Sequence, residues 1–316
     1  SAGGDAGLGH RAAESDNELL RECVSGMDLV FLIAGLGGGT GSGAAPVVAK
    51  LASEQGALVI AFVTKPFSME GERRLRQAED ALEALRASCD AVVPLPNDLL
   101  MQHMEASATM LDAFAQADAW VSRGVRAICT MLMRTGLINV DFAALRGVFD
   151  KTKGRGKTLF GLGRGEGETI VDEALADLDL CPLIHTPDLA KRADRLLVNI
   201  IGGPELGIAH VNRIMTHVND KFGTPEHTCF GAVIDEGMAG HLELVVIGTT
   251  SGVSTRYIQR ATKQHGVVPA AHSSAPETPG KNSRNGEAVA KQGAKGKSKS
   301  VHRSKLSHKE RETEAQ

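Results

Sequence analysis

Hydrophobic runs and amphipathic stretches alternate through the first hundred residues of the chain. Residues 28–35 (DLVFLIAG) and 57–64 (ALVIAFVT) are short and apolar on both faces, a pattern typical of buried parallel strands. Between them, residues 44–55 favour a helix, because Pro46 would stand near its first turn, where proline is tolerated. A strand, a glycine-rich loop, a helix and a second strand in this order predict a parallel α/β sheet.

The alternation continues into the next stretch. Residues 70–86 predict an amphipathic helix, and residues 89–98 predict a strand that runs into a polar loop. One face of that helix carries Leu75, Ala78, Leu82 and Leu85. A longer helix is expected over about 108–133, and because it is more apolar than a surface helix we place it centrally, between two domains.

The pattern changes in the second half of the chain. Strands are predicted at 196–203, 230–235 and 242–250, with a helix between the first two and only the turn 236–240 between the last two. Because strands joined by a short turn are usually neighbours, an antiparallel or mixed sheet is expected. The glycine-rich run 157–169 precedes another helix, and on its own it could form an anion-binding loop.

These patterns divide the chain into three parts. We expect a parallel-sheet domain with the central helix at 1–134, a smaller α+β domain at 135–253 and a basic, disordered tail at 254–316. From residue 271 onward the tail holds ten Lys or Arg against five acids and almost no apolar residues, so ordering it would cost entropy without burying surface. It is interpreted as a solvated linker, with contact to a polyanion or a partner as the alternative.

Composition excludes several classes of protein. Of 316 residues, 42% are hydrophobic and 23% charged, as in ordinary globular proteins. The formal charge of -3 argues against a surface built for nucleic acid, and 3% aromatic residues offer few platforms for stacking bases. No apolar run approaches the roughly 20 residues of a membrane span. The five cysteines are scattered without a CxxC pair, which favours free thiols in the cytosol.

The strongest chemical signal is the loop 35–43, GLGGGTGSG, between a predicted strand and a predicted helix. So many glycines let backbone N–H groups converge on one anion, and the helix dipole and the hydroxyls of Thr40 and Ser42 add to the attraction. The loop lacks the lysine of a GxxxxGK[ST] motif and does not match GxGxxG. It predicts phosphate binding, with a tight turn for packing alone as the alternative.

These residues carry a family resemblance. The segment GLGGGTGSGAAPVVA resembles the signature loop of the tubulin superfamily in its bacterial cell-division branch, the FtsZ family. The similarity spans roughly residues 2–250 and continues, in the family's order, through VTKPFSMEGERRLRQAE, PNDLL, GLINVDFA, LLVNIIGGPEL and FGAVID. It implies an α/β, tubulin/FtsZ-like fold and a GTP-binding cytoskeletal protein of the cytoplasm. Such a protein polymerises at the division site and hydrolyses GTP between subunits. In the family, the region of 157–169 is a glycine-rich connection.

The resemblance also implies which residues hold the nucleotide. The GTP phosphates would be cradled by Gly37, Gly38, Gly39, Thr40 and Gly41, and Mg²⁺ would accompany the nucleotide without a separate metal site. The ribose and guanine would be held by Glu70, Arg74, Asn97, Phe114 and Asp118. An aromatic ring and a carboxylate are a plausible means of selecting GTP over ATP. From chemistry alone, Glu70 and Arg74 could equally form a surface ion pair, and Phe114 could be a core residue.

The loop 136–142 (GLINVDF) corresponds to the family's catalytic loop. The resemblance implies that Asn139 and Asp141 act on the nucleotide of the neighbouring subunit, so the main partner would be a second copy, head to tail in a protofilament. Other division proteins are further possible partners; the membrane would be reached only indirectly, and no specific nucleic acid is expected. The alternative for Asp141 is a helix cap, and both roles are compatible.

Three departures from the family pattern bear on function. Ala144 stands where the family usually carries a second acid, and an alanine can neither accept a proton nor orient water, so hydrolysis is expected to be weakened. A GTP-binding scaffold or modulator of filaments is therefore the alternative function. The chain also starts inside the family fold, without its first strand and glycine turn, and is interpreted as a fragment. The last ten residues, SHKERETEAQ, lack the apolar peptide that tethers relatives to the membrane.

An oxidoreductase that binds a dinucleotide is disfavoured, because the chain has no GxGxxG motif after a predicted strand.

Overall fold

The computed structural model describes most of residues 2–250. The residues outside the description are 1, 102–103, 105–106, 135, 150–156, 185–192, 224, 226 and 251–316. The predicted basic tail at 254–316 therefore lies outside the described residues.

The first half of the chain builds a parallel sheet, as the hydrophobic pattern predicts. Its strands are β1 (Leu29–Gly35), β2 (Leu58–Lys65) and β3 (Ala91–Pro96), hydrogen-bonded in the order β1-β2-β3. Both pairs are parallel, and Gly35 lies opposite Thr64 while Thr64 lies opposite Leu95. The carboxyl ends of the three strands therefore meet at one edge of the sheet.

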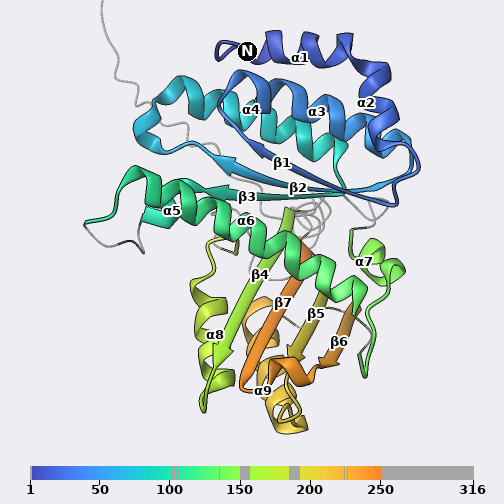
Figure 1. Ribbon diagram of the computed structural model, residues 1–316, viewed down its shortest axis with the longest axis vertical. Coiled ribbons are helices and arrows are strands. Elements are labelled where there is room, and N and C mark those ends of the chain that lie inside the picture. The colour runs from blue at the N-terminus through green and yellow to red at the C-terminus, as the bar shows by residue number, and fades with distance from the viewer. Residues whose placement is uncertain are drawn as a thin grey trace, which may run out of the picture. The chain divides into compact units, whose positions relative to one another are not determined.

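Helices α3 (Gly39–Glu54) and α4 (Glu72–Ser88) cover one face of this sheet (Figure 1). Helices α1 (Ala6–Ser15) and α2 (Asn17–Val24) lie against α3, and the short α5 (Asn97–Met101) follows β3. Strand β2 is buried on both faces: Val59 and Val63 pack in the cluster that holds α3 and α4, whereas Ile60 and Phe62 pack in the cluster that holds α6. This two-sided burial explains its unbroken apolar run.

Strand β1 differs from the expectation that both of its faces are buried. Ile33 is 60% exposed, and the other residues of β1 are half-buried or exposed. The strand stands at the end of the order β1-β2-β3, so among the described residues it has one neighbouring strand instead of two. An apolar run shows that a strand is suited to burial, but it does not show which edge of the sheet is covered.

The long helix α6 (Met110–Met133) begins at a capping box, in which the Asp112 N–H donates to Thr109 Oγ1 (3.2 Å) and the Thr109 N–H to Asp112 Oδ2 (2.8 Å). Its apolar side is buried in a core cluster that contains residues of both sheets. Phe62 of the first sheet meets Phe160 of the second edge to face, with ring centroids 5.2 Å apart. No helix in the described part of the chain is long and apolar enough to cross a bilayer.

The second sheet is mixed, as expected, but its strand order differs from the expectation. Strands β4 (Lys157–Glu166), β5 (Arg195–Gly202), β6 (His227–Ile234) and β7 (His241–Thr250) lie in the order β4-β7-β5-β6. Only β5 and β6 are parallel, joined through α9 (Ile208–Phe222). Although only the turn η3 (Glu236–Met238) separates β6 from β7, they are not neighbours, because β7 inserts between β4 and β5 and pairs antiparallel with both.

The glycine-rich run 157–169 is mainly a strand, so its interpretation as a loop was wrong. Strand β4 pairs with β7 along its whole length. A Cβ on Gly163 would lie 2.2 Å from the Ala174 carbonyl oxygen, and one on Gly165 would lie 1.8 Å from that of Ile170. Alternate glycines therefore let α8 (Ile170–Leu180) approach the backbone of β4 closely. The remaining helix, α7 (Phe142–Val148), precedes β4.

Candidate functional site

The carboxyl edge of the first sheet gathers the sequence-predicted pocket residues. The glycine-rich loop leaves the end of β1, the 3-10 turn η1 (Ser68–Glu70) follows β2, and Asn97 directly follows β3. In open parallel sheets, ligands bind at this edge, because the loops there diverge toward the helices on the sheet's faces.

Backbone geometry opens the glycine-rich loop toward this edge. The N–H of Leu36 donates to the Thr64 carbonyl (2.9 Å), and the N–H of Gly37, which has a φ of 91°, donates to Ser42 Oγ (2.8 Å). The first bond of the α3 ladder joins the Ser42 N–H to the Gly38 carbonyl (3.2 Å). The N–H groups of residues 38–41 therefore precede the ladder at the positive end of the helix dipole, the arrangement that binds phosphate.

Some of the loop's glycines are also required for packing. A Cβ on Gly41 would lie 2.0 Å from the Gly35 carbonyl oxygen, and a Cβ on Gly39 would lie 2.8 Å from the Asp5 nitrogen. Gly38 faces open space within 4 Å. Packing therefore explains the glycines at positions 39 and 41, whereas position 38 is open to an approaching anion.

Two residues that sequence reasoning missed hold the loops of this edge in place. Gln77 of α4 donates from Nε2 to the Gly38 carbonyl at 2.9 Å, which ties α4 to the glycine-rich loop. Asp98 accepts the Ser68 N–H (2.9 Å) and also the Ser68 hydroxyl, which ties α5 to η1. The sequence signal for the role of Gln77 was a polar residue beside the apolar face of the predicted helix at 70–86.

Glu70 and Arg74 form an ion pair, as their spacing alone allows. Glu70 lies in η1, ahead of α4, and its Oε1 also accepts the Phe67 N–H at 2.9 Å. The Glu70 side chain is 21% exposed and that of Arg74 is 52% exposed. The pair stands beside the glycine-rich loop, because a Cβ on Gly37 would lie 3.0 Å from the Arg74 carbonyl oxygen.

An aromatic pair and a buried amide lie farther along the same edge. Phe114 of α6 meets the buried Phe67 edge to face, with centroids 5.6 Å apart, and remains 44% exposed. Its free surface offers a platform on which a planar base could stack. Asp118 follows one helical turn later and is exposed. Asn97 is 4% exposed, and its buried Oδ1 accepts no hydrogen bond from any described residue, which suits a polar ligand group.

The predicted catalytic loop lies at the other end of α6. Asn139 Oδ1 accepts the Gly136 N–H (2.5 Å), and Asp141 Oδ1 accepts the Ala144 N–H (2.7 Å), so Asp141 is the N-cap of α7. An antiparallel bridge between Ile138 and Ala232 fixes the loop to β6. Met133, the last residue of α6, stands fifteen positions after Asp118, a rise of about 22 Å. Asn139 and Asp141 are therefore not brought together with the pocket residues of the same chain.

Two acids and two cysteines of the described chain have shifted pKa values. Hydrogen bonds from Thr109 lower the pKa of Asp112 in the α6 cap. Burial alone would raise the pKa of Asp179, but hydrogen bonds from Lys221 and His217 on α9, with their charges, hold it below its ordinary value of 3.8. Burial raises the pKa of the Cys181 and Cys229 thiols, and for Cys229 the charge of Asp141 adds to the rise. No disulfide links any of the five cysteines, all of which lie in the described part of the chain.

Two family models match the chain. Residues 1–105 match the GTPase domain of the tubulin/FtsZ family, and residues 156–252 match the C-terminal domain of the FtsZ family.

Solved structures agree with these matches. An FtsZ dimer from M. jannaschii is 31% identical, with a TM-score of 0.69, covering 81% of this chain and 72% of that one. A CetZ2 protofilament with bound GTPγS from Haloferax volcanii is 24% identical, with a TM-score of 0.63, covering 83% of this chain and 79% of that one, and its likeness concerns the fold.

Proposed function

The chain belongs to the tubulin/FtsZ family, and on that premise we propose that it binds GTP at the carboxyl edge of its first sheet and polymerises head to tail. The observation that carries the proposal is the separation of the two half-sites along α6. The pocket residues stand near its start, whereas Asn139 and Asp141 follow its end. Neither half can complete a hydrolytic site within one chain, so a second copy supplies the missing half.

Different residues at the carboxyl edge contact the phosphates, the guanine and the ribose of the nucleotide. The phosphates lie against the N–H groups of residues 38–41, where they meet the positive end of α3. The guanine stacks on the exposed surface of Phe114, and the Asp118 carboxylate accepts from the guanine N–H groups. Asn97 offers its unpaired Oδ1, and Glu70 binds a ribose hydroxyl, with Arg74 beside it.

Hydrolysis takes place where two copies meet. Asn139 and Asp141 of the next copy, both exposed, orient the attacking water over the terminal phosphate. The exposed Thr40 hydroxyl at the start of α3 is an oxygen of the kind that Mg²⁺ prefers beside phosphates. Bound with the nucleotide, Mg²⁺ would supply charge neutralisation of the phosphates. The hydrogen bond that Asp141 Oδ1 accepts from the Ala144 N–H fixes the orientation of the Asp141 carboxylate.

The biological role follows from the resemblance to FtsZ. We place the protein in the cytoplasm at the division site, as the polymer that organises septation, with domains at 1–134 and 135–253. The 31% identity to an FtsZ and the match to the FtsZ C-terminal domain support this proposal.

Equilibrium binding of GTP and ATP tests the pocket. Wild type should prefer GTP, and Asp118→Asn should weaken GTP binding at least about tenfold while leaving ATP unchanged, because the lost carboxylate contacts only guanine. Asp220→Asn, which removes a charge from an exposed position on α9, is the matched control. Equal affinity for GTP and ATP in the wild type would contradict the assignment.

A hydrolysis-impaired scaffold is the second candidate function, and Ala144 favours it. Ala144 lies in the first turn of α7, three residues after the cap, where an acidic side chain is accepted by the helix dipole. Ala144→Asp should therefore fold, and it should raise phosphate release per polymerised subunit. Unchanged turnover would show that the missing acid does not limit hydrolysis.

A further inference from the structure

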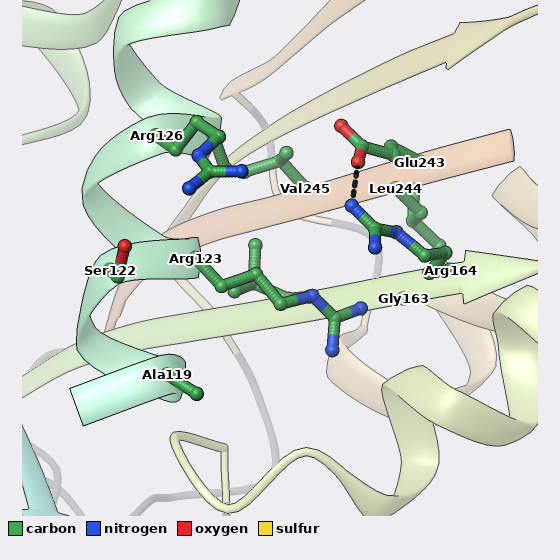
Figure 2. Close-up of a pocket in the computed structure, with 11 residues that line it drawn as sticks. Ala119, Ser122, Arg123, Arg126, Gly163, Arg164, Glu243, Leu244 and Val245 are labelled. Carbon is green, nitrogen blue, oxygen red and sulfur yellow. Dashed lines mark hydrogen bonds and ion pairs between the residues drawn. The ribbon is translucent and has the colours of Figure 1, made fainter. Parts of the chain in front are cut away.

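A buried amide interrupts the apolar strand β5 on the face of the second sheet that is turned toward α6. Asn199 lies opposite Val245 of β7 and therefore shares its face. On the same face, Arg164 pairs with Glu243, as Figure 2 shows. The Asn199 side chain has no such partner: it is 1% exposed, and its Nδ2 donates to no residue that the structure describes. A buried donor without an acceptor costs free energy, because it has lost its hydrogen bonds to water.

Folding alone does not require an amide at this position. The residues around it in β5 are apolar and fully buried, namely Leu196, Leu197, Val198 and Ile200. An apolar side chain of similar size would continue this core without leaving a donor unbonded. A residue that lowers stability in this way is expected where it serves function, because functional sites are often less stable than the fold allows.

Asn199 adjoins the catalytic loop 136–142. In the sheet it lies opposite Gly231 of β6, and a Cβ on Gly231 would stand 2.4 Å from Asn199 Oδ1 and 2.4 Å from Val140 Cγ2. The amide and Val140 therefore share the space beside one glycine. Val140 is 6% exposed and directly precedes Asp141. Because position 231 carries no side chain, the loop can pack against the buried amide.

The loop also offers acceptors for the unbonded donor. Ile138 is held to β6 by two backbone hydrogen bonds, whereas the carbonyls of Asn139 and Val140 accept no backbone N–H from a described residue. These two carbonyls directly precede Asp141. A hydrogen bond from Asn199 Nδ2 to one of them would fix the backbone next to the carboxylate that orients the attacking water.

We propose that Asn199 is a positioning residue of the hydrolytic site. When a second copy covers the catalytic loop, Asn199 Nδ2 donates to the carbonyl of Asn139 or Val140 and fixes Asp141 over the terminal phosphate. The inference rests on the proposed function, because it concerns the loop that enters the site of the next copy. Asn199 touches neither the nucleotide nor the water, so it acts on turnover and not on the affinity for GTP.

Phosphate release and thermal unfolding of Asn199→Leu test the proposal, because leucine resembles asparagine in shape but lacks the donor. The Tm should rise by about 1–4 °C, since the unbonded donor is removed. Turnover per pelleted subunit should fall at least about tenfold, because the loop loses its hydrogen bond in the assembled state. The affinity of the unassembled chain for GTP should stay unchanged. A residue that only supports the fold would not raise the Tm and lower turnover together.

Thr158→Val is the matched control. Thr158 is also a buried polar residue of the second sheet, but its Oγ1 accepts the Val92 N–H of β3, at 3.2 Å, and lies outside the catalytic loop. The control should lower the Tm, since the Val92 N–H loses its acceptor, and should keep the wild-type turnover. If Asn199→Leu does not fold, Asn199→Val decides the outcome, because valine is smaller and suits a strand.

The outcomes separate this inference from the proposed function. If the wild type hydrolyses GTP and the folded Asn199 variant does so at the same rate, the inference alone is overturned. A folded variant whose Tm falls together with its turnover would also overturn it, because the amide would then be a structural residue. A wild type that releases no phosphate from GTP would overturn both the proposed hydrolysis and this inference.

Discussion

Asp141 is expected to have two roles that a pair of substitutions can separate. Its Oδ1 accepts the Ala144 N–H at 2.7 Å and caps α7, while the carboxylate is exposed for the nucleotide of another copy. Asp141→Asn keeps the side chain's size and its ability to cap but removes the negative charge. Asp141→Ala removes both the cap and the charge.

The two roles differ in magnitude and in readout. Loss of an N-cap costs about 1 kcal/mol, which lowers the Tm of a protein with a folded part of this size by roughly 2–4 °C. Asn caps as well as Asp does, so Asp141→Asn should change the Tm by less than about 1 °C. Loss of a group that orients or activates water costs on the order of 100-fold or more in turnover, so both variants should lose turnover alike.

Phosphate release in a polymerising sample and calorimetric unfolding measure the two effects. Asp16→Asn is the control, since Asp16 is an exposed acid beside α2 without a side-chain cap bond. It should leave both turnover and Tm unchanged. If Asp141→Asn hydrolyses GTP at the wild-type rate, Asp141 serves only as a cap and the catalytic role is refuted.

Three further predictions rest on packing and charge. Gly41→Ala places a Cβ 2.0 Å from the Gly35 carbonyl oxygen and should lower the free energy of unfolding in urea by roughly 1–3 kcal/mol. Gly38→Ala, where a Cβ meets open space, should lower it by less than about 1 kcal/mol. Equal losses of unfolding free energy for the two variants would contradict the packing argument. Because the pKa of Asp179 is lowered in the folded chain, its ionised carboxylate stabilises the fold above pH 3.8, and this stabilisation is lost as the pH falls through the folded pKa. The loss of unfolding free energy caused by Asp179→Asn should therefore become smaller below pH 3.8. A loss that stays constant with pH would refute this prediction. Burial raises the pKa of Cys181, so a thiol reagent should modify it only as fast as the protein unfolds, and rapid labelling of the folded chain would contradict this.

The sequence predicted the first sheet well, because its elements are local. Each strand of that sheet is a continuous apolar run, and the glycine-rich loop stands between β1 and α3 as the motif predicts. The family resemblance and the α/β fold are confirmed by the two family models. The roles of the pocket residues and of the catalytic loop remain predictions.

What the sequence did not predict depends on contacts between distant residues. The short turn between β6 and β7 does not indicate that β7 inserts between β4 and β5, because strands that are consecutive in the chain need not pair. The glycines of β4 resembled a loop because their reason, close approach of α8, lies in another element. Gln77 and Asp98 act by holding loops, and polar residues of this kind look like ordinary surface residues in a sequence.

High-speed sedimentation of the purified chain with GTP, with GDP and without nucleotide tests the central claim most directly. Our account predicts a pellet that appears with GTP alone, because the nucleotide joins the carboxyl edge of one copy to the loop after α6 of the next. A pellet of equal size in all three conditions, or no pellet with GTP, would contradict GTP-dependent head-to-tail assembly.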